Sequence, residues 1–173
     1  VAVDANGNLF AGNNYGGAPF VVKIPWNSTT MSYAPYTATP TANCTGPTSD
    51  TAACLMPNIG VVVSGVITGE PLQSMVFDSH GNLFYGVQTD SAGAGTSGID
   101  YEGSIWECDA ACLYAGTDQP VMLGEEPTVT TSGGVDSADS AFTSLSPTTK
   151  VSQILGGLAV DSVGNLFFTD EAQ

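Results

Sequence analysis

Short apolar runs recur three times along the chain, and the same polar turn follows each of them. The runs span residues 1–3, 75–77 and 158–160. Each continues into the pattern Asp-x-x-Gly-Asn-Leu-Phe, which begins at Asp4, Asp78 and Asp161 and keeps five of its seven positions identical in all copies. An internal repeat of this kind is the strongest sequence signal of a repetitive architecture.

Each copy of the pattern predicts a β-hairpin. The apolar run predicts a strand, and the carboxylate of Asp can accept backbone N–H groups inside the turn. Gly supplies the positive φ that a tight turn requires, and Asn-Leu-Phe begins the returning strand. The predicted turn residues are Asp4, Gly7, Asn8, Asp78, Gly81, Asn82, Asp161, Gly164 and Asn165. Because the first strand is apolar at consecutive positions, we expect it to be buried on both faces.

The segments that follow the first two hairpins predict two further strands each. Residues 20–24 and 103–107 predict third strands, and residues 32–36 and 120–124 predict fourth strands. A repeated four-stranded antiparallel unit is a propeller blade. The sequence therefore predicts an all-β, β-propeller-like domain over 1–173. Its parts are blade 1 at about 1–37 with an insertion at 38–69, blade 2 at about 70–126 with an insertion at 127–152, and a partial blade 3 at about 153–173.

The hairpin pattern, together with a Val-Lys-Ile-Pro strand at 22–25, resembles NHL-repeat β-propellers of the secreted bacterial type. The resemblance covers residues 1–36, about 70–126 and 155–173. Some NHL-like propellers are lyases with histidines and a metal at the central channel. This chain has one histidine, His80, at a turn position occupied by Asn6 and Val163 in the other copies. The lyase activity is therefore not carried over, and we expect His80 to be an exposed turn residue.

The spacing of the repeats departs from that family. The aspartates of successive copies lie 74 and 83 positions apart, whereas propeller repeats run about 40–50 residues. Each period holds either one blade with a long insertion or a second, degenerate blade. The richness of the extra segments in Thr, Ser, Gly and Pro favours insertions. Residues 60–69 are the exception, since their apolar pattern is compatible with an extra strand.

Two blades and one hairpin are too few to close a propeller, which needs about four to eight blades. Open sheet faces and edges invite pairing with another chain. We therefore expect either a piece of a longer chain or a unit completed by neighbouring copies. The first and last hairpins carry the same motif 157 positions apart, as head-to-tail continuation into rings or filaments would require.

Composition excludes several partners. The chain has seventeen acidic residues, two lysines and no arginine, for a net charge of −15. Nucleic acids and anionic membranes are therefore excluded, because both require clustered basic residues. The longest apolar run, at 59–67, is interrupted and about half the length of a membrane span. The rest of the composition, which is polar but largely uncharged, is typical of a secreted protein. Salt or divalent cations would favour self-assembly of such an acidic chain.

The four cysteines form two local pairs in the sequence. Cys44 and Cys54 bracket a loop rich in Thr, Gly and Pro, and Cys108 and Cys112 bracket three residues. Four cysteines allow three pairings, of which we expect the two local ones. Disulfides indicate an oxidising compartment, hence an extracellular or cell-surface location. A metal site with His80 is the alternative, but the spacings lack the Cys-x-x-Cys pattern of zinc sites.

Other candidate sites are weaker. Two acidic groups, one that includes Glu107 and Asp109 and one in a Ser-rich loop, contain the Ca²⁺ candidates Asp100, Glu102, Asp136 and Asp139. A solvated acidic face is the preferred interpretation, and no other cofactor is expected. Asn27 and Asn43 begin N-glycosylation sequons. The aromatic residues are candidates for either a glycan-binding surface or packing between sheets. They are Tyr15, Trp26, Tyr33, Tyr36, Tyr85, Tyr101, Trp106 and Tyr114.

Three functions remain open on this basis. We expect a secreted structural protein whose units are completed by copies of itself in an extracellular filament or surface layer. The first alternative is a fragment of a larger NHL-type propeller that binds a carbohydrate or a protein. The second is a propeller lyase or hydrolase, although the sequence offers no catalytic set and we expect no enzymatic activity.

Overall fold

The chain folds into small antiparallel sheets with almost no helix, so the all-β prediction is confirmed. The computed structural model describes residues 1–13, 20–36, 40–57, 59, 72–90, 101–115, 120–125 and 155–170. Within these ranges the helical segment is η1, a single π-helical turn at Ala111–Ala115. None of the described helical residues form a segment long and apolar enough to cross a membrane.

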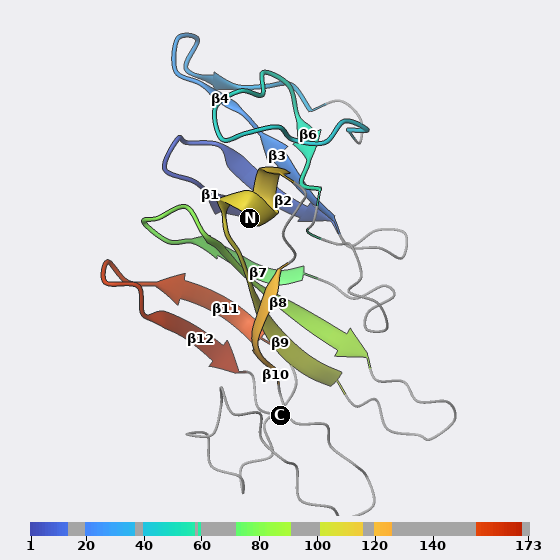
Figure 1. Ribbon diagram of the computed structural model, residues 1–173, viewed down its shortest axis with the longest axis vertical. Coiled ribbons are helices and arrows are strands. Elements are labelled where there is room, and N and C mark those ends of the chain that lie inside the picture. The colour runs from blue at the N-terminus through green and yellow to red at the C-terminus, as the bar shows by residue number, and fades with distance from the viewer. Residues whose placement is uncertain are drawn as a thin grey trace, which may run out of the picture.

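Sheet 1 contains four strands in the order β1-β2-β3-β6 (Figure 1). They are β1 (Ala2–Val3), β2 (Leu9–Asn13), β3 (Phe20–Ile24) and β6 (Cys54–Leu55). All neighbours are antiparallel, with β3 in the expected third place. The fourth strand, β6, comes from the segment that the sequence predicted to be an insertion.

The fourth strand predicted at 32–36 is wrong. Ser32–Tyr33 (β5) pairs instead with Trp26–Asn27 (β4) in a separate two-stranded hairpin. The physical reason lies in the turn between them. The side-chain oxygen of Asn27 accepts hydrogen bonds from the backbone N–H groups of Thr29 and Thr30. This Asx turn reverses the chain immediately after β3, which leaves the open edge of sheet 1 to β6.

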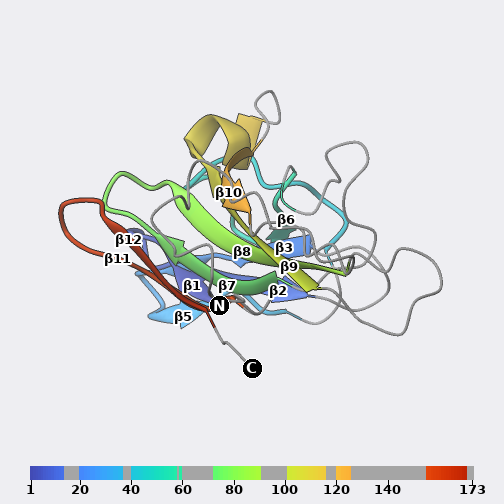
Figure 2. The ribbon, with the colours of Figure 1, turned by 90° about the horizontal axis from the view of Figure 1, so that it is seen from below.

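Sheet 2 contains four antiparallel strands in the order β7-β8-β9-β10. They are β7 (Leu72–Phe77), β8 (Leu83–Asp90), β9 (Tyr101–Cys108) and β10 (Val121–Glu125). Here the predicted third and fourth strands are confirmed. The connection between β9 and β10 contains η1, which projects together with β10 from one side of the molecule (Figure 2).

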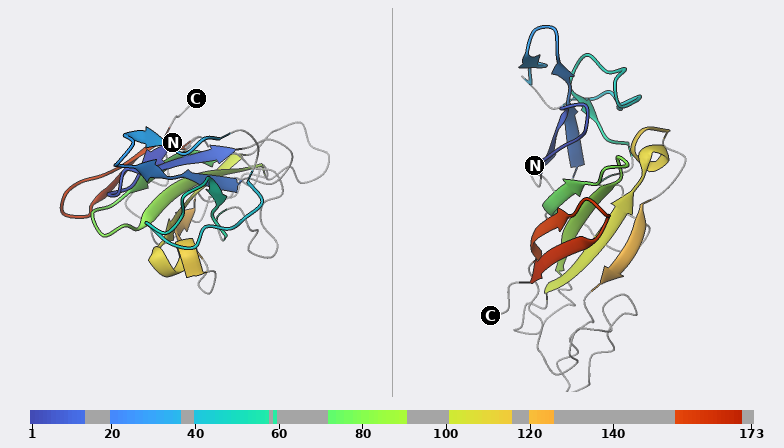
Figure 3. Two further views of the ribbon diagram at one scale, coloured as in Figure 1. Left: turned by 90° about the horizontal axis from the view of Figure 1, so that it is seen from above. Right: turned by 90° about the vertical axis from the view of Figure 1, so that its left-hand side faces the viewer.

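The third repeat forms a hairpin of β11 (Leu155–Val160) and β12 (Leu166–Asp170). The first strands of the three repeats are neighbours in sequence order, since β1 contacts β7 and β7 contacts β11. Figure 3 shows the resulting arrangement, with sheet 1 in blue above sheet 2 and the hairpin in red beside sheet 2. No closed ring of sheets forms among the described residues.

The core lies between sheets 1 and 2. The rings of Phe10 on β2 and Phe77 on β7 are tilted with centroids 4.6 Å apart. At Gly12, an added Cβ would lie 3.2 Å from Cδ1 of Leu72, so glycine permits the close approach of the two sheets. Burying a side chain such as Phe10 contributes about 1.5–3 kcal/mol, so this interface is a main source of stability.

Burial of the first strand on both faces is wrong for β1. Ala2 is buried, but Val1 and Val3 are exposed, because sheet 2 covers one face of sheet 1 and the other faces solvent at this strand. In β7, which lies between sheet 1 and β11, Met75 is buried and its neighbours Val76 and Phe77 are partly buried. The extra strand predicted at 60–69 and the insertion predicted at 127–152 lie outside the described residues.

Candidate functional site

The three predicted turns have one hydrogen-bond geometry. In each, Oδ1 of the Asp accepts the backbone N–H groups of the residues two and four positions later, at 2.8–3.0 Å. Oδ2 accepts the side-chain N–H of the Asn at 2.8–2.9 Å. The glycines have φ values of 82°, 87° and 90°, a region that favours glycine. The Asp, Gly and Asn residues therefore have the same role within the turn in all three copies.

In the second and third turns these hydrogen bonds favour the ionised carboxylate. Burial raises the pKa of Asp78, but hydrogen bonds from Asn82 and His80 outweigh it and lower the pKa overall. The side chain and backbone of Asn165 likewise lower the pKa of Asp161. The role of the Asn as a partner of the Asp was missed from the sequence, although the invariant four-residue spacing in all three copies is a signal for it.

The first turn makes contacts that the third lacks among the described residues. Asn8 is buried, and its Nδ2 also donates to the carbonyl oxygen of Pro47 at 2.8 Å. Its Oδ1 accepts the backbone N–H of Trp26 at 3.0 Å. Asn165, at the equivalent position, is exposed and hydrogen-bonded within its own turn. The same seven-residue motif thus connects sheet 1 to the 44–54 loop in one copy and faces solvent in another.

Lys23, the fourth residue of β3, is the one charged residue that is buried among the described residues. Its side chain is fully buried, and Nζ donates to the carbonyl oxygens of Gly46 and Pro47 and to Oδ2 of Asp50 at 3.1 Å. Nζ also lies 5.1 Å from the ring centroid of Tyr114, within cation–π range. All three N–H donors of the ammonium are therefore satisfied, as a buried charge requires.

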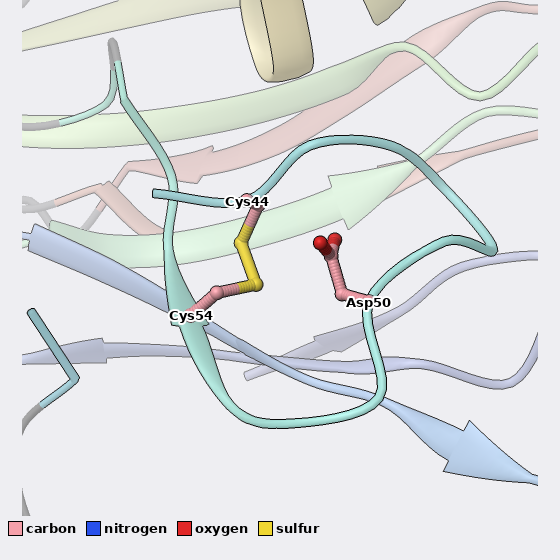
Figure 4. Close-up of side chains that lie close together, drawn as sticks. All are labelled: Cys44, Asp50 and Cys54. Atoms are coloured by element: carbon pink, nitrogen blue, oxygen red, sulfur yellow. A yellow bond between two sulfur atoms is a disulfide. The ribbon is translucent and has the colours of Figure 1, made fainter. Parts of the chain in front are cut away.

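Asp50 is held in place by the loop that carries it. Its Oδ1 accepts hydrogen bonds from the backbone N–H and the hydroxyl of Thr45. Burial raises the pKa of Asp50, but these bonds and the Lys23 ammonium lower it overall. The disulfide between Cys44 and Cys54 closes the same loop (Figure 4). The loop that binds the lysine is thus closed by a covalent bond.

The second disulfide lies in the segment that contacts Lys23 through Tyr114. It joins Cys108 at the end of β9 to Cys112 in η1, and Oδ1 of Asp109 accepts the N–H groups of Ala111 and Cys112. This tight turn places Tyr114 against the lysine. Burial, with the nearby carboxylates of Asp4 and Asp50, raises the pKa of Tyr114, so the ring remains neutral. Both local pairings expected from the sequence are present, and the two closed segments meet at Lys23.

Sequence reasoning did not identify Lys23 as a structural centre. The available signal was its position in the run 20–24, where a lone lysine stands between valine and isoleucine on a strand that is otherwise apolar. Periodicity places its side chain on the same face as Val21. The partners come from segments 23 or more residues away, which no local pattern reveals.

A metal ion would require several acidic or cysteine side chains close together. Among the described residues, the one group with suitable spacing is Cys44, Asp50 and Cys54. Both sulfurs are in the disulfide and the carboxylate is paired with Lys23, so this group has a structural role. The Ca²⁺ candidates Asp100, Asp136 and Asp139, and the side chain of Glu102, lie outside the described residues.

His80 lies on the exposed tip of the second turn. Its side chain is 79% exposed, with Nδ1 at 3.6 Å from Oδ2 of Asp78. Its backbone N–H donates to the same aspartate, as the equivalent residues do in the other copies. This position fits the exposed turn residue expected from the sequence.

The sequon asparagines Asn27 and Asn43 are both exposed. Of the aromatic candidates, Tyr85 is buried and Tyr114 packs on Lys23, whereas Trp26 and Tyr33 form an edge-to-face pair with centroids 4.9 Å apart. Tyr36, three residues after Tyr33 in the sequence, is also exposed. Tyr15 and the side chain of Tyr101 lie outside the described residues.

One repeated apolar position changes its environment from copy to copy. The last residue of the motif is fully buried at Phe10, 9% exposed at Phe84 and 57% exposed at Phe167. Each is paired across its hairpin with a first-strand residue, respectively Ala2, Val76 and Ala159. The face that carries this position is covered by sheet 2 in the first copy. In the third copy it is open, and it forms the candidate interaction surface of the molecule.

The comparison with known proteins gives no relative from which a role can be transferred. No protein-family model, no curated protein and no solved structure matches the chain.

Proposed function

We propose that the chain is a secreted structural protein whose propeller-like sheets are completed by neighbouring copies in an extracellular filament or surface layer. The observation that carries this proposal is the uncovered apolar face of the third hairpin. The same face is covered in the first two repeats, where it buries Phe10 and Phe84, yet Phe167 is 57% exposed. Exposed apolar faces of this kind mark sites of protein association.

The chemistry of the chain supports an extracellular location. Two disulfides stabilise the segments around Lys23, and such bonds persist in oxidising compartments. The NHL-type hairpin motif, with the first strands of three repeats side by side, supports the propeller-like arrangement. Repeated sheets that do not close into a ring among the described residues suit a subunit of a larger assembly.

Net charge makes the proposed assembly dependent on ionic strength. Each copy carries a formal charge of −15, so copies repel one another at low salt. Raising the salt concentration from about 0.01 M to about 1 M shortens the Debye length from about 30 Å to about 3 Å. Association through an apolar face should therefore increase over this range.

The test is sedimentation velocity over a series of protein and salt concentrations, followed by electron microscopy of the highest-salt samples. The proposal predicts concentration-dependent species larger than a dimer and regular filaments or sheets. A parallel series with CaCl₂ or MgCl₂ at matched ionic strength separates screening from a specific effect of divalent cations. A monomer at every concentration and salt would contradict the proposal.

A second candidate function, binding of a carbohydrate, is favoured by a different surface. Trp26 and Tyr33 pair on the β4–β5 hairpin, and the side chain of Tyr36 is also exposed. Aromatic side chains with an apolar face and a polar tip suit such contacts. Titration with soluble polysaccharides, monitored by tryptophan fluorescence, tests this function. A response that Tyr33→Ala abolishes supports it, and no response to any polysaccharide contradicts it.

A further inference from the structure

The contact between successive repeats follows a positional rule. Phe10, the last residue of the first motif, packs on Phe77, the residue that immediately precedes the second motif. The residues at the position of Phe77 in the other repeats are Val3 and Val160. Each of them is paired with the motif leucine across its hairpin, on the face opposite to the motif phenylalanine. Every repeat therefore has a phenylalanine face and an opposite face that receives the preceding repeat.

Two of these faces are open at the outer hairpins. Phe167 and Val3 are 57% and 52% exposed, and no sheet of the described residues lies against either side chain. On the Val3 face the open part is limited to β1, since Val22 of β3 is buried. The corresponding positions between the sheets are covered, since Phe10 is buried and Phe77 and Val160 are partly buried. The molecule thus has one open phenylalanine face, at Phe167, and one open face of the opposite type, at Val3. Faces of these two types pack together inside the chain.

The two open faces also match in chemistry. The described side chains beside Phe167 on its face are those of Ala159 and Thr169, which do not ionise, and the carboxylate of Asp161 lies at the turn end of this face, where Asn165 binds it. Val3 is paired with Leu9, so the opposing face is also apolar. For a protein with a charge of −15, faces with few carboxylates are the places where two copies approach with least repulsion.

We infer that the Phe167 face of one copy packs on the Val3 face of a second copy and repeats the geometry of the Phe10–Phe77 contact between molecules. This inference rests on the proposed function and names the surfaces that it uses. The contact is heterologous, so it forms closed rings or open filaments. A symmetric contact of two Phe167 faces would leave both Val3 faces uncovered and would match nothing inside the chain.

Cross-linking of single-cysteine variants tests the pairing. All four native cysteines are in disulfides, so a new cysteine is the only free thiol. Val3→Cys and Phe167→Cys proteins are mixed and treated with a bismaleimide that reaches about 10 Å, the spacing of packed sheets. We expect a covalent dimer in the mixture, at least about tenfold more abundant than in either variant alone. Thr29→Cys, on the exposed turn between β4 and β5, replaces Val3→Cys in the control mixture and should give no dimer.

The outcomes separate this inference from the proposed function. Assembly that persists without the Val3–Phe167 cross-link, or a Phe167→Cys dimer as abundant as the mixed one, overturns the inference and leaves the function standing. A closed dimer that cross-links as expected supports the inference and contradicts the proposal that copies form a filament. Two copies supply six repeat hairpins, three from each chain, which falls within the four to eight blades of closed propellers. A monomer under all conditions overturns both.

Discussion

The first and third hairpins share one turn but differ in almost everything around it. Both have the same aspartate and asparagine hydrogen bonds and a glycine at nearly the same φ. Around the first hairpin, Phe10 packs on sheet 2 and Asn8 connects to the 44–54 loop. Around the third, Phe167 and Asn165 are exposed. The comparison shows that the motif encodes a self-sufficient turn, whereas the surroundings determine what its outer residues do.

The largest difference should appear when the motif phenylalanines are truncated. Phe10→Ala leaves a cavity between sheets 1 and 2 and should lower the free energy of unfolding by roughly 3–5 kcal/mol. Phe167→Ala should change it by less than about 0.5 kcal/mol, because the side chain is exposed. Urea unfolding of dilute protein at low salt measures both. Equal losses would show that the third hairpin is covered within the monomer.

At high salt, Phe167→Ala should also affect the association of copies. Phe167→Ala should weaken self-association by about 2 kcal/mol, or about thirtyfold in dissociation constant, if Phe167 is a central contact. Sedimentation equilibrium gives this constant, and Thr29→Ala, on an exposed turn, is the matched control. Unchanged association of Phe167→Ala would remove this residue from the interface.

Replacement of the buried lysine tests why the first hairpin is held so firmly. Lys23→Met leaves Asp50 without its cation and the carbonyls of Gly46 and Pro47 without a donor. The loss should be about 3 kcal/mol, at the low end for a broken buried pair because Thr45 still binds Asp50. Urea unfolding measures it. Lys23→Met with Asp50→Leu should recover part of the loss, and an undiminished stability of Lys23→Met would contradict the role of the lysine.

A smaller contrast is expected between the motif asparagines. Asn8→Ala removes hydrogen bonds to Asp4, Pro47 and Trp26 at a buried position, and should cost roughly 2–3 kcal/mol. Asn165→Ala removes a side-chain bond at an exposed turn and should cost less than about 1 kcal/mol. Thermal unfolding monitored by circular dichroism ranks the two. The reverse order would mean that the third hairpin is the more embedded one.

Acid should weaken the turns by a modest amount. The pKa values of Asp78 and Asp161 are lowered in the folded protein, so their contribution is present above the unfolded-state value of about 3.9 and is lost as pH falls through the folded values. The contribution of these two aspartates to stability should therefore be constant at about pH 5–6 and fall below about pH 4. Urea midpoints measured against pH check this, and Asp78→Asn should flatten the acid limb. A loss that begins above about pH 6 would require other groups.

The sequence predicted local features well because they arise from local chemistry. Each Asp-x-x-Gly-Asn turn contains its own hydrogen-bond partners, and the two disulfides join cysteines 10 and 4 positions apart. The fourth strand of sheet 1 was misplaced because an Asx turn at Asn27 competes with continuation of the sheet. The Lys23 cluster was missed because its partners come from two segments far from it in the sequence, the 44–54 loop and η1. Unequal exposure of identical phenylalanines is likewise decided by packing.

Hydrogen exchange measured as a function of protein concentration tests most directly whether the third hairpin is completed by another copy. At high salt, we expect protection of residues 155–170 and 1–3 to rise with protein concentration, while protection of residues 83–86 in the covered β8 stays constant. Phe167→Ala should remove the concentration dependence without changing protection of β8. Protection of residues 155–170 that is the same at every concentration, in samples that do assemble, would show that no other copy covers the third hairpin.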